Sequence, residues 1–391
     1  MKFKLGYDTL VNNLEYVSTI VEDRLLDESM RNIIVRINKS GIVHFIGYNS
    51  IVICRTRLEE GDYRLTEEDD KYDESQNFYM QLKAKELMNF LNTFKSLKRT
   101  KPTDVLIETV NNKLRLTVFE VEDTDNGIRE LSSKWVFDNI PLKLNVKNEI
   151  NMELKATETS LQSINVSFYL ASLTPLLSDE NGNGLPSRMH FGDEYVFVVT
   201  GMFATLFKNE LPEAFKQVVF TYSALNFMKK VLDRNEVVDI GKTESHLILA
   251  TDTSEAFIRY IPKMPDTAIY QKAFKRDHVI VLDRKYLKDV VKRLSLTNDM
   301  ATVEIDTSNE GILVKNSKFS QLVPIQFERG MTELGKITFK IATKVLDKAI
   351  IGDDNVFPEQ IGIYINPLAN TGYVLIFSDS SDKWFSTVQV R

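Results

Sequence analysis

The chain has 391 residues but only one cysteine, Cys54, and four widely spaced histidines. A single cysteine cannot form an internal disulfide, so the sequence suits a reducing compartment. The histidines lack the spacing of metal ligands, and Cys54 lies within an apolar run that is typical of a core residue. We therefore expect no metal site and no cofactor.

Long apolar runs and catalytic motifs are also missing. No stretch approaches the roughly 20 apolar residues that span a bilayer, and the first ten residues lack the apolar core of a signal peptide. The glycines at 181–184 precede no predicted helix, so they indicate a turn and not a phosphate-binding loop. No pair of carboxylates stands out for acid–base chemistry. We expect a soluble, cytoplasmic protein without membrane association, without catalytic residues and without enzymatic activity.

A repeated pattern is what the sequence does contain, and residues 78–121 show it best. An alternating strand at 78–82 leads into an amphipathic helix, and alternating strands follow at 104–110 and 113–121. Asn111-Asn112 predicts the two-residue hairpin turn between them, because Asn tolerates the left-handed conformation. The apolar face of the helix is formed by Leu87, Phe90, Leu91, Phe94 and Leu97.

This unit of strand, helix and hairpin recurs six times. One copy has too few strands to be stable alone, so we expect copies to pair into three domains, 1–145, 146–270 and 271–391. The fold class is then α+β, with antiparallel sheets. Copy three is expected to begin with a strand at 149–155. The inward face of its helix is expected to be Leu161, Ile164, Phe168 and Ala171.

Positive charge is concentrated in four of the predicted helices. Residues 83–99, 223–234, 283–293 and 341–350 together carry 15 Lys and Arg but 5 Asp and Glu, although the whole chain has a net charge of −6. The remainder is therefore strongly acidic. Basic helices within an acidic protein indicate that one surface faces an anionic partner such as nucleic acid.

Three similar domains, each built from two such units, resemble the bacterial-type β sliding clamp of replicative DNA polymerases. The resemblance extends over the whole chain. Residues 198–206, VVTGMFATL, resemble the clamp strand that ends in Thr-Asp-Gly, and 264–270, MPDTAIY, resemble the Phe-Pro-Asp-Tyr linker. The chain also ends on a strand at 385–391, as these clamps do. A divergent, phage-encoded version would suit the low likeness.

The resemblance implies a ring in which two subunits join head to tail. Helices would line the hole around double-stranded DNA, sheets would form the outside, and the replicative polymerase and the clamp loader would be partners. DNA contact would be independent of sequence. An exposed edge strand at 104–110 is expected to join domain three of the other subunit. The residues expected to face DNA are Lys85, Lys95, Arg99, Lys229, Lys230, Arg284, Lys285, Lys288, Lys292, Lys344 and Lys348.

The resemblance further implies a hydrophobic cleft between domains two and three that receives short peptide motifs. Its residues would be Thr200, Gly201, Phe203, Pro265, Ile269, Tyr270, Val388 and Val390. The chain ends in Val-Gln-Val-Arg where the family often has Met-Pro-Met-Arg-Leu, so the peptide preference is left open. The alternative hypothesis is a clamp-like protein-interaction scaffold that does not encircle DNA, which would bind peptides strongly without forming a ring.

Overall fold

A computed structural model describes most of the chain. The described residues are 2–21, 28–37, 42–58, 61–65, 78–95, 100–124, 127–151, 159–177, 187–199, 203–262, 277–296, 300–306, 310–350, 359–367, 373–378 and 384–390. They form two compact units, one of residues 1–163 with 230–259 and one of 164–229 with 260–391. The predicted turn at 181–184 lies outside the described residues.

Unit one contains two sheets. The first has the strand order β5-β1-β7-β8-β9 and the second the order β10-β15-β16-β17-β4-β3-β2-β6. The first sheet consists of β1 (Lys2–Gly6), β5 (Tyr63–Leu65), β7 (Thr100–Val110), β8 (Lys113–Thr124) and β9 (Gly127–Asp138). The second consists of β2 (Asn32–Ile37), β3 (Val43–Tyr48), β4 (Val52–Arg57), β6 (Phe78–Lys83), β10 (Thr159–Gln162), β15 (Val237–Lys242), β16 (His246–Ala250) and β17 (Ser254–Arg259).

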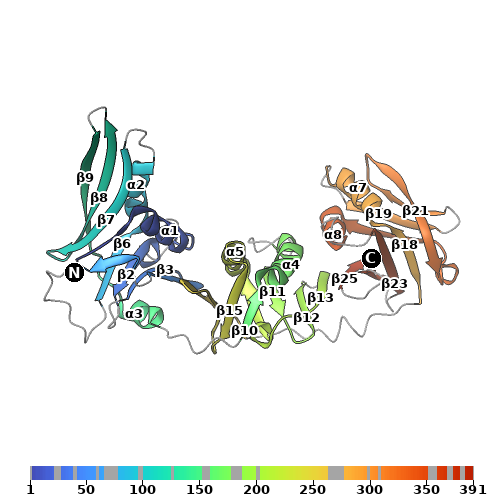
Figure 1. Ribbon diagram of the computed structural model, residues 1–391. Coiled ribbons are helices and arrows are strands. Elements are labelled where there is room, and N and C mark those ends of the chain that lie inside the picture. Colours follow the sequence, from blue (N-terminus) through green and yellow to red (C-terminus); the bar gives the residue numbers. More distant parts are fainter. Residues whose placement is uncertain are drawn as a thin grey trace. The chain divides into compact units, whose positions relative to one another are not determined.

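Two helices connect the sheets of unit one. Helix α1 (Tyr7–Ser18) packs against α2 (Ala84–Lys95), and each of them contacts strands of both sheets (Figure 1). Their apolar stripes follow from the sequence, because Leu87, Leu91 and Phe94 are buried as predicted. The predicted hairpin between β7 and β8 is confirmed, with φ of 50° at Asn111 and 60° at Asn112.

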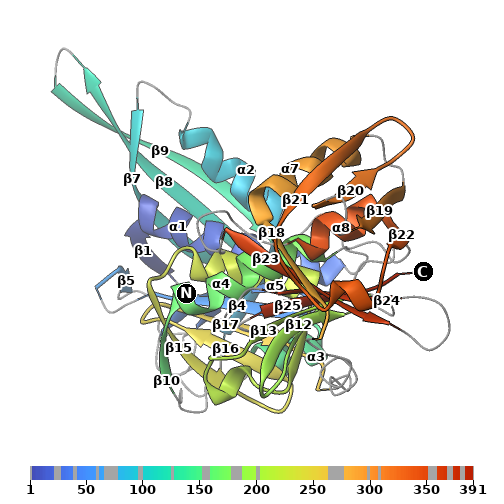
Figure 2. The same cartoon turned by 90° about the vertical axis from the view of Figure 1, so that its right-hand side faces the viewer.

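Unit two contains one sheet of order β14-β11-β12-β13-β25-β24-β23-β18-β21-β20-β19-β22. Its strands are β11 (Arg188–Phe191), β12 (Tyr195–Val199), β13 (Phe203–Lys208), β14 (Val218–Thr221), β18 (Val279–Asp283), β19 (Met300–Asp306), β20 (Gly311–Lys315), β21 (Ser320–Arg329), β22 (Ile337–Ala342), β23 (Gln360–Pro367), β24 (Tyr373–Ser378) and β25 (Trp384–Val390). Its helices are α4 (Ser163–Leu173), most of α5 (Tyr222–Leu232), α7 (Arg284–Ser295) and α8 (Thr343–Ala349), of which α7 and α8 pack together (Figure 2).

Strand exchange links the copies in pairs. The first strand of one copy joins the hairpin of the other, and the exchange is reciprocal. The exchanged pairs are β1–β7 and β6–β2, then β10–β15 and β14–β11, and finally β18–β23 and β22–β19. Copies one and two, three and four, and five and six are therefore partners. The three domain boundaries stay a prediction, since the contacts group the described residues into two units.

Copy three departs from the sequence-based expectation. The strand predicted at 149–155 does not begin at 149, because that position belongs to helix α3, which spans Leu144–Ile150. Residues 152–158 lie outside the described residues. Val146 and Ile150 are one helical turn apart and are buried against the second sheet of unit one. Burial of this pair selects the helix over the local alternation that indicated a strand.

The predicted inward face of the copy-three helix is also wrong. Leu161 belongs to β10, and Ile164 and Ala171 are exposed on α4. The sequence of α4 is apolar on nearly every side, so its periodicity does not single out one face. The tertiary structure selects a different set, which is Val166, Tyr169, Leu170 and Leu173.

Candidate functional site

Exposed lysines lie on four helices, as the sequence predicts. On α2, Lys85 and Lys95 are exposed, and Lys95 forms an ion pair with Glu15 of α1. On α5, Lys229 and Lys230 are exposed. Arg99 lies outside the described residues. Helix α4 contains no basic residue, so the charge is not shared by all the helices.

Helix α7 is the most strongly basic of these helices. Asp283 caps it by accepting a hydrogen bond of 2.7 Å from the backbone N–H of Tyr286. Its predicted inward residues, Leu287, Val290, Val291 and Leu294, are all buried. Lys285 and Lys292 are exposed and Lys288 is half-buried, so a cationic face lies opposite the apolar one.

Two of the predicted DNA-facing side chains do not fit that role. Arg284 is 2% exposed at the first position of α7, so its guanidinium is not available to a phosphate at the surface. On α8, Lys344 is exposed, but Lys348 is half-buried and its Nζ donates to the backbone carbonyl of Pro175. Burial lowers the pKa of Lys348, which weakens its role as a surface cation.

The predicted peptide cleft is only partly within the described residues. Thr200, Gly201, Pro265, Ile269 and Tyr270 lie outside them, and Phe203 begins strand β13. Val388 and Val390 are buried in β25, where they lie opposite Leu375 and Tyr373 of β24. Leu375, on the same face of the sheet, is buried as well. These two valines are therefore core residues, and they do not form an open wall.

A separate apolar cluster lies on the other face of this sheet. Buried Phe197, Ala204, Leu206 and Ile376 form its floor, and we call it the apolar strip. Partly buried side chains surround the floor, and they are Tyr195, Val199, Tyr364 and Val374. Residues 195–199, YVFVV, are apolar throughout, and such a run indicates a strand that is covered on both faces, which is the signal in the sequence that could have revealed it. The strip crosses the junction where β13 of copy three pairs with β25 of copy six.

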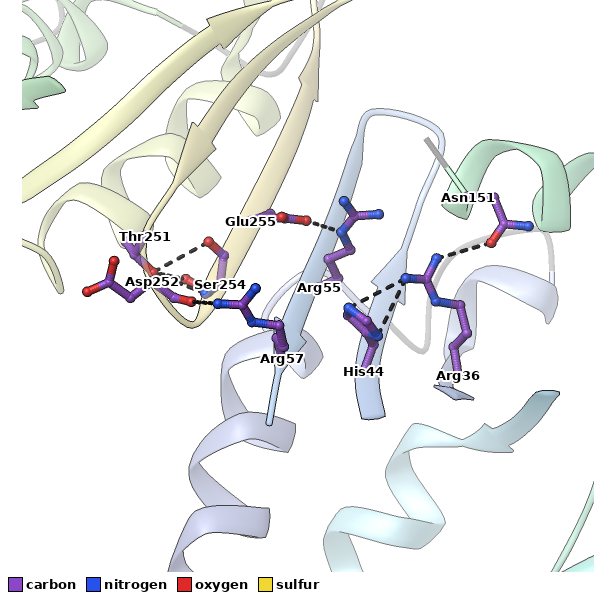
Figure 3. A network of polar contacts seen from close by, with 9 residues as sticks. All are labelled: Arg36, His44, Arg55, Arg57, Asn151, Thr251, Asp252, Ser254 and Glu255. Atoms are coloured by element: carbon purple, nitrogen blue, oxygen red, sulfur yellow. Dashed lines mark hydrogen bonds and ion pairs between the residues drawn. The ribbon is translucent and has the colours of Figure 1, made fainter. Parts of the chain in front are cut away.

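The equivalent junction in unit one carries polar side chains instead. There β4 of copy one pairs with β17 of copy four, and Arg55 lies opposite Glu255 and donates to its carboxylate (Figure 3). Beside this pair, Arg36, His44 and Arg57 stand opposite one another on β2, β3 and β4. A pocket of about 330 Å³ is lined by His44, Arg55 and Arg57 together with side chains from β15 to β17.

Open sheet edges occur at β9 and β21. Strand β9 ends its sheet, with β8 as its neighbour, and exposes Trp135 and Val136. Strand β21 pairs with β20 through residues 320–324 and with β18 through 325–329, so within the described residues one side of 320–324 has no neighbouring strand. The predicted edge at 104–110 is wrong, because β7 pairs with β1 on one side and β8 on the other.

Neither a metal centre nor a membrane span is found in the part of the chain that the structure describes. No three or more His, Cys, Asp or Glu side chains come together there as metal ligands. No helix in that part is long and apolar enough to cross a bilayer.

Comparison with known proteins identifies the fold. The DNA polymerase sliding clamp from Bacillus subtilis is 16% identical, with a TM-score of 0.70 over 100% of this chain and 99% of that one. The DNA polymerase III subunit beta from Pseudomonas aeruginosa is 14% identical, with a TM-score of 0.70 over 100% of both chains. The Helicobacter pylori beta clamp, solved with a DNA ligase peptide, is 12% identical, with a TM-score of 0.65 over 100% of both chains. No protein-family model and no curated protein matches the sequence. The predicted α+β sliding-clamp fold is therefore confirmed.

Proposed function

We propose that this protein is a DNA sliding clamp. Two copies join head to tail into a ring around double-stranded DNA and tether the replicative polymerase, which acts as a partner together with a clamp loader. The protein works in the cytoplasm by tethering and not by catalysis, because a ring on DNA makes polymerase rebinding intramolecular. The observation that carries this proposal is the match of the clamp fold over the entire chain. The low identity to bacterial clamps supports a divergent, phage-encoded version.

A rule in the strand pairing supports the proposed ring closure. Within the chain, β4, the last strand of copy one, pairs with β17, the last strand of copy four. In the same way β13, the last strand of copy three, pairs with β25, the last strand of copy six. Each junction thus joins an odd copy to an even copy of the neighbouring pair. The last strands of copies two and five are left, and these are β9, which ends its sheet, and β21, whose residues 320–324 have a neighbouring strand on one side only within the described residues. Pairing β9 of one subunit with β21 of the other completes the series and closes a dimer.

The register of this pairing can be carried over from the β4–β17 junction, where Arg55 lies opposite Glu255. Counted from the equivalent turns, Arg55 corresponds to Leu322 and Glu255 to Lys134. The pair beside it, Cys54 and Ala256, corresponds to Gln321 and Trp135, and both of these residues face helices. Trp135 packs on Phe90 of α2, with ring centroids 5.5 Å apart, and Gln321 donates to the Tyr286 hydroxyl at 2.6 Å. The shared helical face supports this register, in which Leu322 lies opposite Lys134.

DNA contact is proposed for the exposed lysines of the four basic helices. That proposed role is retained by the exposed Lys85, Lys95, Lys229, Lys230, Lys285, Lys292 and Lys344, and by the half-buried Lys288 on the cationic face of α7. Their cations would neutralise phosphates without reading bases, as sliding requires. The apolar strip is the proposed neighbour of the peptide cleft, since it offers partly buried aromatic and aliphatic side chains at the junction of copies three and six.

Retention on circular DNA tests the proposal. The clamp is loaded onto nicked circular DNA, separated from free protein, and the DNA is then linearised. A topological ring stays on the circle at high salt and leaves after linearisation, whereas a protein bound only by charge leaves both forms at high salt. A scaffold that does not encircle DNA would bind polymerase peptides and show no dependence on circularity. Light scattering on the same sample reports whether it is a dimer.

A further inference from the structure

Arg293 of α7 reaches from its helix to the sheet. Its guanidinium donates to the side-chain oxygen of Gln321 on β21 at 3.2 Å. Gln321 in turn donates to the Tyr286 hydroxyl at 2.6 Å, so its amide is held between two residues of α7. Arg293 remains exposed. An exposed guanidinium therefore lies beside residues 320–324, the part of β21 that has one open side within the described residues.

Trp135 is the matching feature on β9. Its side chain is 47% exposed although tryptophan is the largest apolar residue, and its ring packs on Phe90 of α2 with centroids 5.5 Å apart. This contact holds the indole on the helical face of its sheet, the face on which Arg293 lies in unit two. Tryptophan and arginine are enriched among the residues that contribute most to protein–protein binding. Both edges proposed to join thus carry a residue of that kind.

The β4–β17 junction shows what occupies the equivalent positions where two copies are already joined. Tyr16 is the tenth residue of α1, as Arg293 is the tenth residue of α7. The Tyr16 hydroxyl lies next to the Cys54 thiol, and Cys54 corresponds to Gln321 in the register given above. The two helical positions are therefore equivalent both in their place along the helix and in the strand residue that they contact.

A cation and an aromatic ring meet across that internal junction. Arg234 follows α5 in copy four, and its guanidinium lies over the ring of Tyr16 in copy one, 5.3 Å from the ring centroid. This is a cation–π interaction, which is strongest on tryptophan and gains strength when the two groups are shielded from water. One copy supplies the cation and the other supplies the ring.

Building on the proposed pairing of β9 with β21, we propose that Arg293 of one subunit stacks on Trp135 of the other and thereby fixes the subunit joint. The contact depends on the proposed ring, in which Trp135 lies opposite Gln321. Residues directly opposite each other on antiparallel strands have Cβ atoms about 5 Å apart, which brings the indole within reach of the guanidinium beside Gln321. The roles are exchanged relative to the β4–β17 junction, since the odd copy now supplies the cation.

A double-mutant cycle on the dimer dissociation constant, measured by sedimentation, tests this contact. Arg293→Gln and Trp135→Leu should each weaken the dimer at least tenfold, and combining them should add little, because the second change has no contact left to remove. Arg293→Lys keeps the charge but loses the planar guanidinium, so it should weaken the dimer by less than Arg293→Gln. Lys285→Gln is the matched control. It removes the same charge from α7 about 12 Å along the helix axis, and it should change the dissociation constant less than twofold.

Tryptophan fluorescence gives a second readout at the contact itself. The chain has two tryptophans, so Trp384→Phe leaves Trp135 as the reporter. Its emission should shift to shorter wavelength as the protein concentration rises through the dissociation constant, and Arg293→Gln should move this transition to higher concentration. Melting curves verify that each variant is folded.

Two results in a protein that dimerises would overturn the proposed contact and leave the ring standing. One is additive effects of Arg293→Gln and Trp135→Leu, and the other is dimerisation without a shift in the emission of Trp135. A protein that stays monomeric at every concentration would refute the proposed ring as well, so the two failures are distinguishable.

Discussion

Leu322→Lys should open the ring without unfolding the subunit. Leu322 is 44% exposed on the open side of β21, and in the proposed dimer it lies opposite Lys134 of the other subunit. Covering the exposed half of a leucine side chain stabilises an interface by roughly 1 kcal/mol. Like charges placed directly opposite each other across two strands cost up to about 1 kcal/mol more.

The two terms add to about 2 kcal/mol per interface and about 4 kcal/mol for the two interfaces of a closed dimer, which corresponds to roughly a thousandfold weaker dissociation constant. Sedimentation over a range of protein concentrations measures that change. Leu296→Lys is the matched control, because Leu296 is 86% exposed at the end of α7 and lies on no sheet edge. Its dimer should be as stable as that of the unchanged protein.

A compensating change makes the test specific for the register. Adding Lys134→Glu to Leu322→Lys places opposite charges across the interface and should restore most of the lost affinity. A Leu322→Lys protein that remains as dimeric as its control, or a double variant that stays monomeric, would refute the proposed pairing of β9 with β21.

Three further predictions concern DNA, peptide and proton binding. Fluorescence anisotropy measures how log K, the logarithm of the DNA association constant, falls with the logarithm of the salt concentration. Replacing Lys285 and Lys292 by Ala should make this slope shallower by about 0.9 for each lost phosphate contact. The same change at the exposed Lys208 and Lys340 should leave the slope unchanged. Tyr364→Asp in the apolar strip should weaken binding of a polymerase-derived peptide at least tenfold, and unchanged binding would exclude the strip as part of the peptide site. The folded-state pKa of His44, about 3, is below its unfolded value of about 6.5, so the stability contributed by the neutral ring is present above pH 6.5 and is lost as the pH falls toward 3. The loss should approach about 1.4 kcal/mol per pH unit, and urea titrations of His44→Gln should show a smaller loss over the same range.

Much of the fold can be read from the sequence because its signals are local. The stripe of α7 and the Asn111-Asn112 turn depend on residues that are neighbours along the chain, and both were predicted correctly. Helix α4 shows the limit of this approach, since a segment that is apolar on every side gives no preferred face. Helix α3 shows another, because burial of Val146 and Ile150 against distant strands overrides a local strand signal.

The functional side chains were harder to predict than the elements that carry them. Consecutive side chains of an α-helix point in directions about 100° apart, so neighbouring basic residues of one helix can differ completely in exposure. Buried Arg284 and exposed Lys285 are such a pair. The cleft residues Val388 and Val390 were assigned by resemblance. Side chains alternate between the two faces of a strand, and in β25 these two valines lie on the face that is buried in the core.

The sequence by itself determined the six-fold repeat, the basic helices and the α+β class, because each of these follows from periodicity and charge along the chain. The tertiary structure alone decided which edges stay open, which lysines reach the surface, and that Arg36, His44 and Arg57 stand in one row. These features depend on strand order and register, which bring together residues from separate strands. No local pattern encodes that pairing, since it is set by which sheets can bury their apolar faces together.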